Sequence, residues 1–257
     1  MAGSSASTRP SSATSDGPPR ILSLWSAPRS RSTAFLRMMT ERGDYAVVHE
    51  PFSHLVDFGG CEVDGVQVTD ERQLISTLRR MSERGPVFFK DTTDFAYPGL
   101  LADTDFLRDA AHTFIIREPA EVIASHYALN RELKCEDVGI ARLSEIYDAV
   151  AAAIGRPPVV IDSADLVKAP EQTVRAYCAA VGIPFMERAL FWDATMLPAW
   201  RKTRRWHELT SRTTYFTEAG SSYRDTADNN PLLARYLDHH LPYYEKLRNG
   251  RLRIERA

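Results

Sequence analysis

The chain has little of what a disulfide framework or a membrane span requires. It contains three cysteines in 257 residues and no Cys-x-x-Cys pair, so buried or free thiols are expected rather than disulfides or a metal site. No apolar run reaches the length that crosses a bilayer. Residues 1–19 lack the apolar stretch of a signal peptide and are predicted to form a disordered lead. These absences favour a cytoplasmic protein without a membrane partner.

Positive charge is not in excess either. The net charge is −2, which excludes bulk electrostatic attraction to nucleic acid. Only five of the 32 basic residues are lysine, a bias typical of GC-rich genomes. The seven histidines show no metal-ligand spacing, so no metal is expected.

What the chain does have is a regular alternation of apolar strand-like runs and helical patterns. This alternation predicts an α/β fold with a doubly wound parallel sheet of about five strands and helices on both faces, within a single domain over residues 20–257. Residues 195–225 break the pattern and are predicted to form an irregular lid. The predicted strands are 20–25, 45–49, 86–90, 113–117 and 158–162, and the predicted helices are 33–41, 70–81, 119–132, 138–153, 170–181 and 232–247.

A polar turn follows the first predicted strand. Residues 26–33 read Ser-Ala-Pro-Arg-Ser-Arg-Ser-Thr and lead directly into a helical pattern. Backbone N–H groups and a helix N-terminus at such a turn bind phosphate, and arginines and hydroxyls add donors. The turn lacks the Gly-x-x-x-x-Gly-Lys-Ser/Thr pattern of a Walker A loop, and no acidic strand end offers magnesium ligands. Anion binding without a metal is therefore expected here.

A second pair of polar residues follows the fourth predicted strand. Arg117 stands at the end of that strand, and Ser125 follows eight residues later, in the second turn of a helix. Ligands of open α/β sheets bind at the carboxyl ends of the strands, so both side chains could reach one anion. Taken alone, the pair also suits a surface Arg117–Glu118 contact and a serine inside a helix.

In this order and spacing, the two motifs resemble the sulfotransferase family that uses 3′-phosphoadenosine 5′-phosphosulfate. The resemblance implies the P-loop NTPase-like sulfotransferase fold and that nucleotide as the cofactor, with no metal. The segments 159–166 and 170–185 and the closing stretch 241–247 also resemble the family. The resemblance assigns the 5′-phosphosulfate to Pro28, Arg29, Ser30, Arg31, Ser32 and Thr33, and the 3′-phosphate to Arg117 and Ser125.

The sequence departs from the family at three points. Arg31 stands where the loop usually has glycine, and it either grips the sulfuryl oxygens or points away into solvent. The frequent catalytic histidine after the third strand is absent from residues 90–95. The C-terminal glycine-rich clamp on the cofactor is also absent, so Arg205 and Trp206, in the stretch 201–216, are expected to contact the cofactor instead.

The catalytic roles follow from the same motifs. Arg29 matches the family's catalytic lysine and is expected to stabilise developing negative charge, since arginine keeps its proton. Glu50 follows the second strand, and a similar Glu-Pro element of some bacterial carbohydrate sulfotransferases supplies a proposed base. His49 is the alternative base, because histidine titrates near neutral pH. The expected substrate contacts are Lys90, Asp91 and Phe52.

The predicted function is transfer of a sulfuryl group to a hydroxyl, less often an amine, of a small molecule. A natural product or sugar is the expected kind of acceptor in a bacterium. The alternatives are a small-molecule P-loop kinase and a nucleotide-binding protein without catalysis. The sequence indicates no oligomeric state.

Overall fold

The computed structural model describes residues 17–201, 203–208, 210–217 and 222–254. Its centre is a five-stranded sheet in the order β2-β5-β1-β6-β7, in which every neighbouring pair is parallel. Short apolar runs that are buried on both faces form these strands, as expected for a covered parallel sheet. The strands are β1 (Ile21–Ser26), β2 (Ala46–His49), β5 (Val87–Thr92), β6 (Ala111–Ile116) and β7 (Val159–Asp162).

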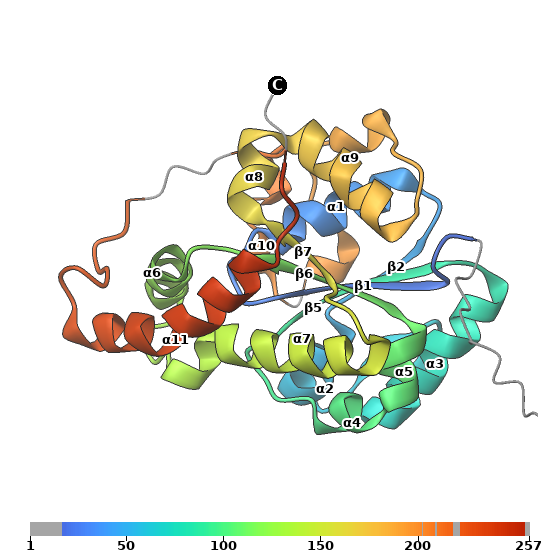
Figure 1. The fold of residues 1–257 in the computed structure, drawn as a ribbon, viewed down its shortest axis with the longest axis horizontal. Coiled ribbons are helices and arrows are strands. Elements are labelled where there is room, and N and C mark those ends of the chain that lie inside the picture. Colours follow the sequence, from blue (N-terminus) through green and yellow to red (C-terminus); the bar gives the residue numbers. More distant parts are fainter. Residues whose placement is uncertain (1–16, 202, 209, 218–221, 255–257) are drawn as a thin grey trace, which may run out of the picture.

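Helices cover both faces of this sheet (Figure 1). The helices α1 and α9 pack on one face, whereas α3, α5 and α7 pack on the other. The principal helices are α1 (Ser32–Arg42), α2 (Pro51–Phe58), α3 (Glu71–Arg84), α6 (Pro119–Leu129), α7 (Ile140–Ile154), α9 (Pro170–Val181) and α11 (Pro231–Asn249). The shorter α-helices are α4 (Pro98–Ala102), α5 (Thr104–Asp109), α8 (Ser163–Lys168) and α10 (Arg204–His207).

The alternating side chains of the strands divide the core into two clusters. Trp25 and Phe89 point into the cluster that contains α3 and α7, whereas Leu24 and Phe88 point into the cluster under α1 and α9. All four side chains are fully buried. Burial of this much apolar surface is the main source of stability for such a domain.

The order of the strands determines where a ligand can bind. In the strand order, the chain leaves β1 toward β2 on one side and leaves β6 toward β7 on the other side. The loops after β1 and β6 therefore diverge at the carboxyl ends of two adjacent strands, which is where open α/β sheets bind ligands. This crevice brings together the two polar motifs that lie about ninety positions apart in the sequence.

All five predicted strands are confirmed, and so are six of the helices with small shifts at their ends. The structure adds the hairpin β3 (Cys61–Val63) and β4 (Val66–Val68), and it adds α2, which the sequence analysis did not predict. The signal for α2 is Pro51 at its first position, where proline is favoured.

The two irregular segments are described only in part. The predicted disordered lead lies outside the described residues except for 17–19. Within 195–225, residues 202, 209 and 218–221 also lie outside them. The rest of this segment forms short helical turns, namely η3 (Pro198–Trp200), α10 and η4 (Thr210–Arg212). None of the helices in the described part of the chain has the length and apolar character needed to cross a bilayer.

Candidate active site

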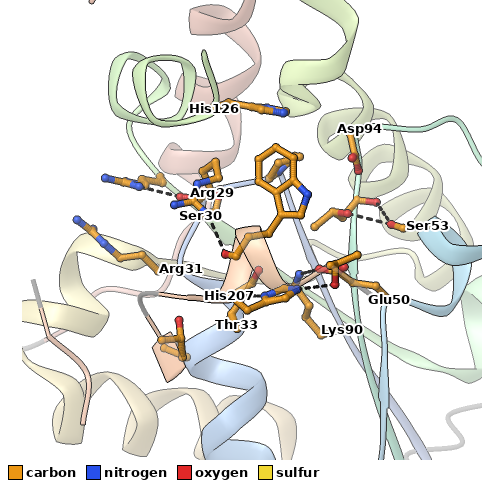
Figure 2. A pocket seen from close by; sticks show the side chains of 18 of the residues that line it. Arg29, Ser30, Arg31, Thr33, Glu50, Ser53, Lys90, Asp94, His126 and His207 are labelled. Atoms are coloured by element: carbon orange, nitrogen blue, oxygen red, sulfur yellow. Dashed lines mark hydrogen bonds and ion pairs between the residues drawn. The ribbon is translucent and has the colours of Figure 1, made fainter. Parts of the chain in front are cut away.

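A cavity of about 390 Å³ opens at the carboxyl ends of the strands. Its wall combines the loop after β1, the ends of β2, β5 and β6, the helices α2 and α6, and the segment around α10 (Figure 2). The polar and aromatic side chains and the loop residues that line it include Pro28, Arg29, Ser30, Arg31, Ser32, Thr33, Glu50, Ser53, His54, Lys90, Asp94, Arg117, His126, Arg205, Trp206 and His207.

The loop between β1 and α1 is tightly folded. Ser26 Oγ donates to Ser32 Oγ over 2.8 Å and closes the loop at its base. Arg29 and Arg31 have φ angles of 67° and 64°, in the left-handed region that residues other than glycine rarely adopt. Strain of this kind is concentrated at ligand sites, where the surrounding structure maintains it.

Ser30 lies between these two arginines and is 1% exposed. Its hydroxyl is buried and has no hydrogen-bond partner among the described residues. A buried polar group without a partner costs free energy, so a ligand with oxygen acceptors in the loop would stabilise the Ser30 hydroxyl by accepting a hydrogen bond from it. The loop is therefore suited to bind an anion.

Arg117 and Ser125 meet this loop directly. Arg29 Nε donates to Ser125 Oγ over 3.0 Å, and Arg117 Nη1 donates to the carbonyl oxygen of Arg29 over 2.8 Å. Arg117 Nε also donates to Glu121 Oε2 over 2.7 Å. Burial lowers the pKa of Arg29, and the charge of Arg117 adds to this effect, whereas Tyr223 opposes it. Two adjacent cations in a partly buried site favour a bound anion.

The side chain of Arg31 approaches the same Glu121 carboxylate that accepts from Arg117. Its Nη2 atom is 3.6 Å from Glu121 Oε2, and its Nη1 atom donates to Ser163 Oγ over 3.5 Å. In Figure 2 it extends away from Glu50 and Lys90 along the wall of the cavity. Arg31 lines the cavity and its side chain is 17% exposed, so it does not point away into solvent.

Replacing Arg31 by glycine is expected to raise the free energy of unfolding by about 0.5–1 kcal/mol, because glycine adopts the left-handed conformation without the steric cost of a side chain. Urea unfolding measures this difference. The matched control is Arg80→Gly in the interior of α3, where glycine should destabilise by about 1 kcal/mol. A loss of stability for Arg31→Gly would show that the contacts of its side chain outweigh the strain.

The segment around α10 forms one wall of the cavity. Arg29 Nη1 donates to the carbonyl oxygen of Trp206 over 2.9 Å, which ties this segment to the loop after β1. The guanidinium of Arg205 lies 4.7 Å from the Trp206 ring, and the ring of His126 packs edge-on against Trp206 at 5.3 Å. Trp206 thus offers an aromatic surface next to the cationic end of the cavity, where a base could stack.

His207 joins the same segment to α1. Its Nδ1 and Nε2 atoms lie within hydrogen-bond distance of Thr33 Oγ1 and Thr203 Oγ1, at 3.2 and 3.0 Å. Burial lowers the pKa values of His126 and His207 to about 4, so both rings are neutral near pH 7. The sequence analysis did not select either residue. Their one available signal was position, since each directly follows a predicted cofactor contact.

Glu50 and Lys90 form a buried ion pair at the other end of the cavity (Figure 2). The Lys90 ammonium contacts Glu50 Oε1, and the second oxygen lies 3.4 Å from His49 Nε2. Burial acts to raise the pKa of Glu50, but His49, Lys90 and His207 outweigh it and hold that pKa well below its usual range. Burial lowers the pKa of His49 to about 3. Glu50 is therefore an ionised carboxylate whose Oε1 atom is paired with the Lys90 ammonium, and His49 is neutral.

The backbone explains why Glu50 faces the cavity. Glu50 precedes α2 with a φ of 46°, and its side chain does not cap the helix. Asp91 takes over that role, since its carboxylate accepts from the backbone N–H groups of Phe52 and Ser53 at 2.6 and 3.1 Å. The carboxylate of Glu50 is thereby left to contact Lys90.

The expected substrate contacts Asp91 and Phe52 do not lie in the wall of the cavity. Asp91 is fully buried beneath it, holding the N-terminus of α2. Phe52 is fully buried in the core, with its ring 5.5 Å from both Trp25 and Tyr97. Neighbouring residues of a strand point to opposite faces, so Lys90 reaches the cavity and Asp91 does not.

Two groups of side chains bring possible metal ligands together, although their spacing in the sequence did not indicate it. The ligand atoms of His49, Glu50 and His54 lie within 4.8 Å of one another, and the same holds for Cys135, His239 and His240 near α11. The first group shares Glu50 with the Lys90 ammonium, whose charge opposes a second cation there.

The parallel sheet, the strained loop after β1 and the Arg–Ser pair across it define an α/β domain with a cationic crevice at the carboxyl ends of its strands. Residues 20–250 match the family model described as "Sulfotransferase domain", so the chain belongs to the sulfotransferase family. The predictions of this family, of its fold and of a sulfotransferase enzyme are thereby confirmed.

Two curated relatives come from Arabidopsis thaliana. "Branched-chain-amino-acid aminotransferase-like protein 2" is 27% identical over 244 residues, which cover 89% of this chain and 41% of that protein. "Branched-chain-amino-acid aminotransferase-like protein 1" is 26% identical over 188 residues, which cover 70% of this chain and 33% of that protein. The chain therefore spans less than half the length of these relatives.

Solved structures also match this chain at low sequence identity. The sulfotransferase domain of the olefin synthase from Synechococcus PCC 7002 is 14% identical with a TM-score of 0.49, and the match covers 88% of this chain and 96% of that chain. The sulfotransferase domain of the curacin biosynthetic pathway is 15% identical with a TM-score of 0.40, and the match covers 68% and 77% of the two chains.

Proposed function

We propose that this domain transfers the sulfuryl group of 3′-phosphoadenosine 5′-phosphosulfate to a hydroxyl, less often an amine, of a small molecule. The observation that carries the proposal is the buried Ser30 hydroxyl, which has no partner among the described residues and lies between two strained arginines. Oxyanion ligands satisfy such donors. Family membership supports the sulfuryl-transfer chemistry.

The residues around the cavity fit this donor. The loop 28–33 would hold its 5′-phosphosulfate, Arg117 and Ser125 would hold its 3′-phosphate, and Trp206 with Arg205 would contact the adenine. When bound, the donor supplies an electrophilic sulfur and a phosphate leaving group. Arg29 keeps its proton and stabilises the charge that develops on the leaving oxygen. Lys90, held by Glu50, adds positive charge on the acceptor side.

Calorimetry tests the nucleotide assignment without knowledge of the acceptor. Adenosine 3′,5′-bisphosphate is expected to bind at least ten-fold more tightly than adenosine 5′-monophosphate, because the latter leaves Arg117 without a 3′-phosphate to contact. Binding should not require magnesium. Equal affinity for the two nucleotides would contradict the two-ended site.

Transfer itself is measured with a ³⁵S-labelled donor and a panel of alcohols, phenols, sugars and amines. Label in any acceptor, dependent on the protein, is the expected result. Bisphosphate binding without transfer would favour the alternative of a nucleotide-binding protein without catalysis. Magnesium-dependent transfer from ATP would favour the kinase alternative.

A further inference from the structure

Asp94 is a cavity carboxyl with no role in binding the donor. It lies two residues beyond the end of β5, the strand that carries Lys90, and its side chain faces the same cavity (Figure 2). Its Oδ1 atom is buried and has no hydrogen-bond partner among the described residues. A buried carboxylate oxygen without a donor is costly, so a donor from a bound ligand would stabilise it.

The backbone around Asp94 is held on several sides. The N–H and hydroxyl groups of Thr93 both donate to the carbonyl oxygen of Ser26, at 3.0 and 3.2 Å, and the hydroxyl also reaches the carbonyl oxygen of Gly139 over 2.8 Å. Arg142 donates to the carbonyl oxygen of Asp94 itself. These hydrogen bonds fix the backbone at Asp94 next to the loop after β1. A proton acceptor needs such a fixed position to meet the substrate hydroxyl.

The environment gives this carboxyl a suitable proton affinity. Burial raises the pKa of Asp94 to about 6, and the charge of Glu50 adds to the rise, while Thr92 and the ammonium of Lys90 oppose it. A general base works best when its pKa lies near the working pH. Asp94 is therefore ionised near neutral pH but binds a proton more readily than an exposed aspartate.

Other titratable groups at the cavity are less suited to this task. Glu50 is already paired with the Lys90 ammonium through its Oε1 atom, and its pKa is depressed. His207 has both ring nitrogens within hydrogen-bond distance of threonine hydroxyls, and the pKa values of His207 and His126 are lowered to about 4. His54, in the first turn of α2, also lines the cavity, and a variant of it is compared with Asp94→Asn below.

We propose that Asp94 is the general base that accepts the proton of the acceptor's hydroxyl. The inference rests on the proposed function and names a residue other than the predicted bases Glu50 and His49. The O–H bond of the acceptor breaks and its proton moves to Asp94 Oδ1, while the acceptor oxygen bonds to sulfur. The sulfur–oxygen bond to the nucleotide phosphate breaks, and adenosine 3′,5′-bisphosphate leaves with that bonding pair.

The test compares Asp94→Asn with the wild type, using the labelled donor and a productive acceptor from the panel. Asp94→Asn is expected to lower kcat by about 100-fold or more, the scale of losing a general base, with bisphosphate affinity changed less than three-fold. In the wild type, kcat/KM should fall below about pH 6, where Asp94 becomes protonated, and this acid limb should be absent from Asp94→Asn.

Three variants serve as comparisons. Asp238→Asn removes the same charge from an exposed position on α11, outside the wall of the cavity, and should retain both the rate and the acid limb. His54→Gln should retain the acid limb, and Glu50→Gln should retain it at a lower pH, because the charge of Glu50 no longer raises the pKa of Asp94. Loss of that limb in either of these variants, but not in Asp94→Asn, would overturn the inference and assign the base to that residue.

A readout without turnover completes the test. Infrared spectra of the free protein should show a carboxyl C=O band that titrates near pH 6 and is missing from Asp94→Asn. Absence of such a band in the wild type would contradict the inference even where the bisphosphate binds. A wild type that binds no bisphosphate and labels no acceptor would overturn the proposed function, and with it the assignment of Asp94.

Discussion

Replacing Arg117 by alanine is expected to weaken the binding of adenosine 3′,5′-bisphosphate by about 100-fold or more, since each charge-assisted hydrogen bond to a phosphate contributes about 1.5–3 kcal/mol. The loss has two sources. The variant lacks the guanidinium that would face the 3′-phosphate. It also lacks the hydrogen bond from Arg117 to the carbonyl oxygen of Arg29, which holds the loop after β1 in place. Calorimetry with the bisphosphate measures the change.

Two controls separate these sources. Arg175→Ala removes an exposed arginine on α9 that pairs with Glu171, and it should leave the affinity unchanged. Arg117→Lys keeps the charge but not the planar fork, so it should bind with intermediate affinity. Adenosine 5′-monophosphate should lose much less affinity than the bisphosphate in Arg117→Ala. Unchanged bisphosphate affinity would rule out Arg117 as the 3′-phosphate ligand.

Glu50→Gln is expected to lower the free energy of unfolding at pH 7 by about 3 kcal/mol, because it leaves a buried ammonium without its counter-ion. Lys90 is 1% exposed, and its side chain contacts the carboxylate directly. Chemical unfolding measures the loss. The pKa of Glu50 is depressed in the folded state, so the contribution of its charge is present above about pH 4.3, the ordinary value for glutamate, and is lost as the pH falls below it.

The matched comparison is the double variant Glu50→Gln with Lys90→Met. Removing both charges should restore most of the stability, because the cost lies in the unpaired ion rather than in the absence of the pair. Sulfuryl transfer by the double variant should be lower than that of the wild type, since the positive charge of Lys90 is absent. If Glu50→Gln is as stable as the wild type, water or another group must stabilise the Lys90 ammonium in place of the carboxylate.

The fold was largely predictable from local sequence patterns. Apolar runs such as 87–89 and 114–116 can only be buried on both faces, and helical patterns between them dictate parallel connections. The α2 helix was missed because its eight residues follow a strand directly and leave little room for a periodic pattern. Its start depends on Asp91, a cap from another strand that local sequence does not reveal.

The active-site residues divide in the same way. Arg29, Ser30 and Thr33 belong to one continuous loop, and Arg117 and Ser125 have a characteristic spacing, so a pattern can select them. Selecting Lys90 but not Asp91 requires knowing which face of β5 meets the cavity. Asp94, His126 and His207 carry no local motif, because their roles depend on burial and on partners from other elements.

The sequence by itself determined the α/β class, the five parallel strands and the two anion motifs, since short-range periodicity and turn chemistry encode them. Only the tertiary structure decided which charges are paired and which are left for a ligand. Glu50 is paired with Lys90, whereas Asp94 Oδ1 and Ser30 Oγ are buried without a partner among the described residues. Desolvation and pairing depend on the atoms that surround a group in space, and these come from segments far apart in the chain.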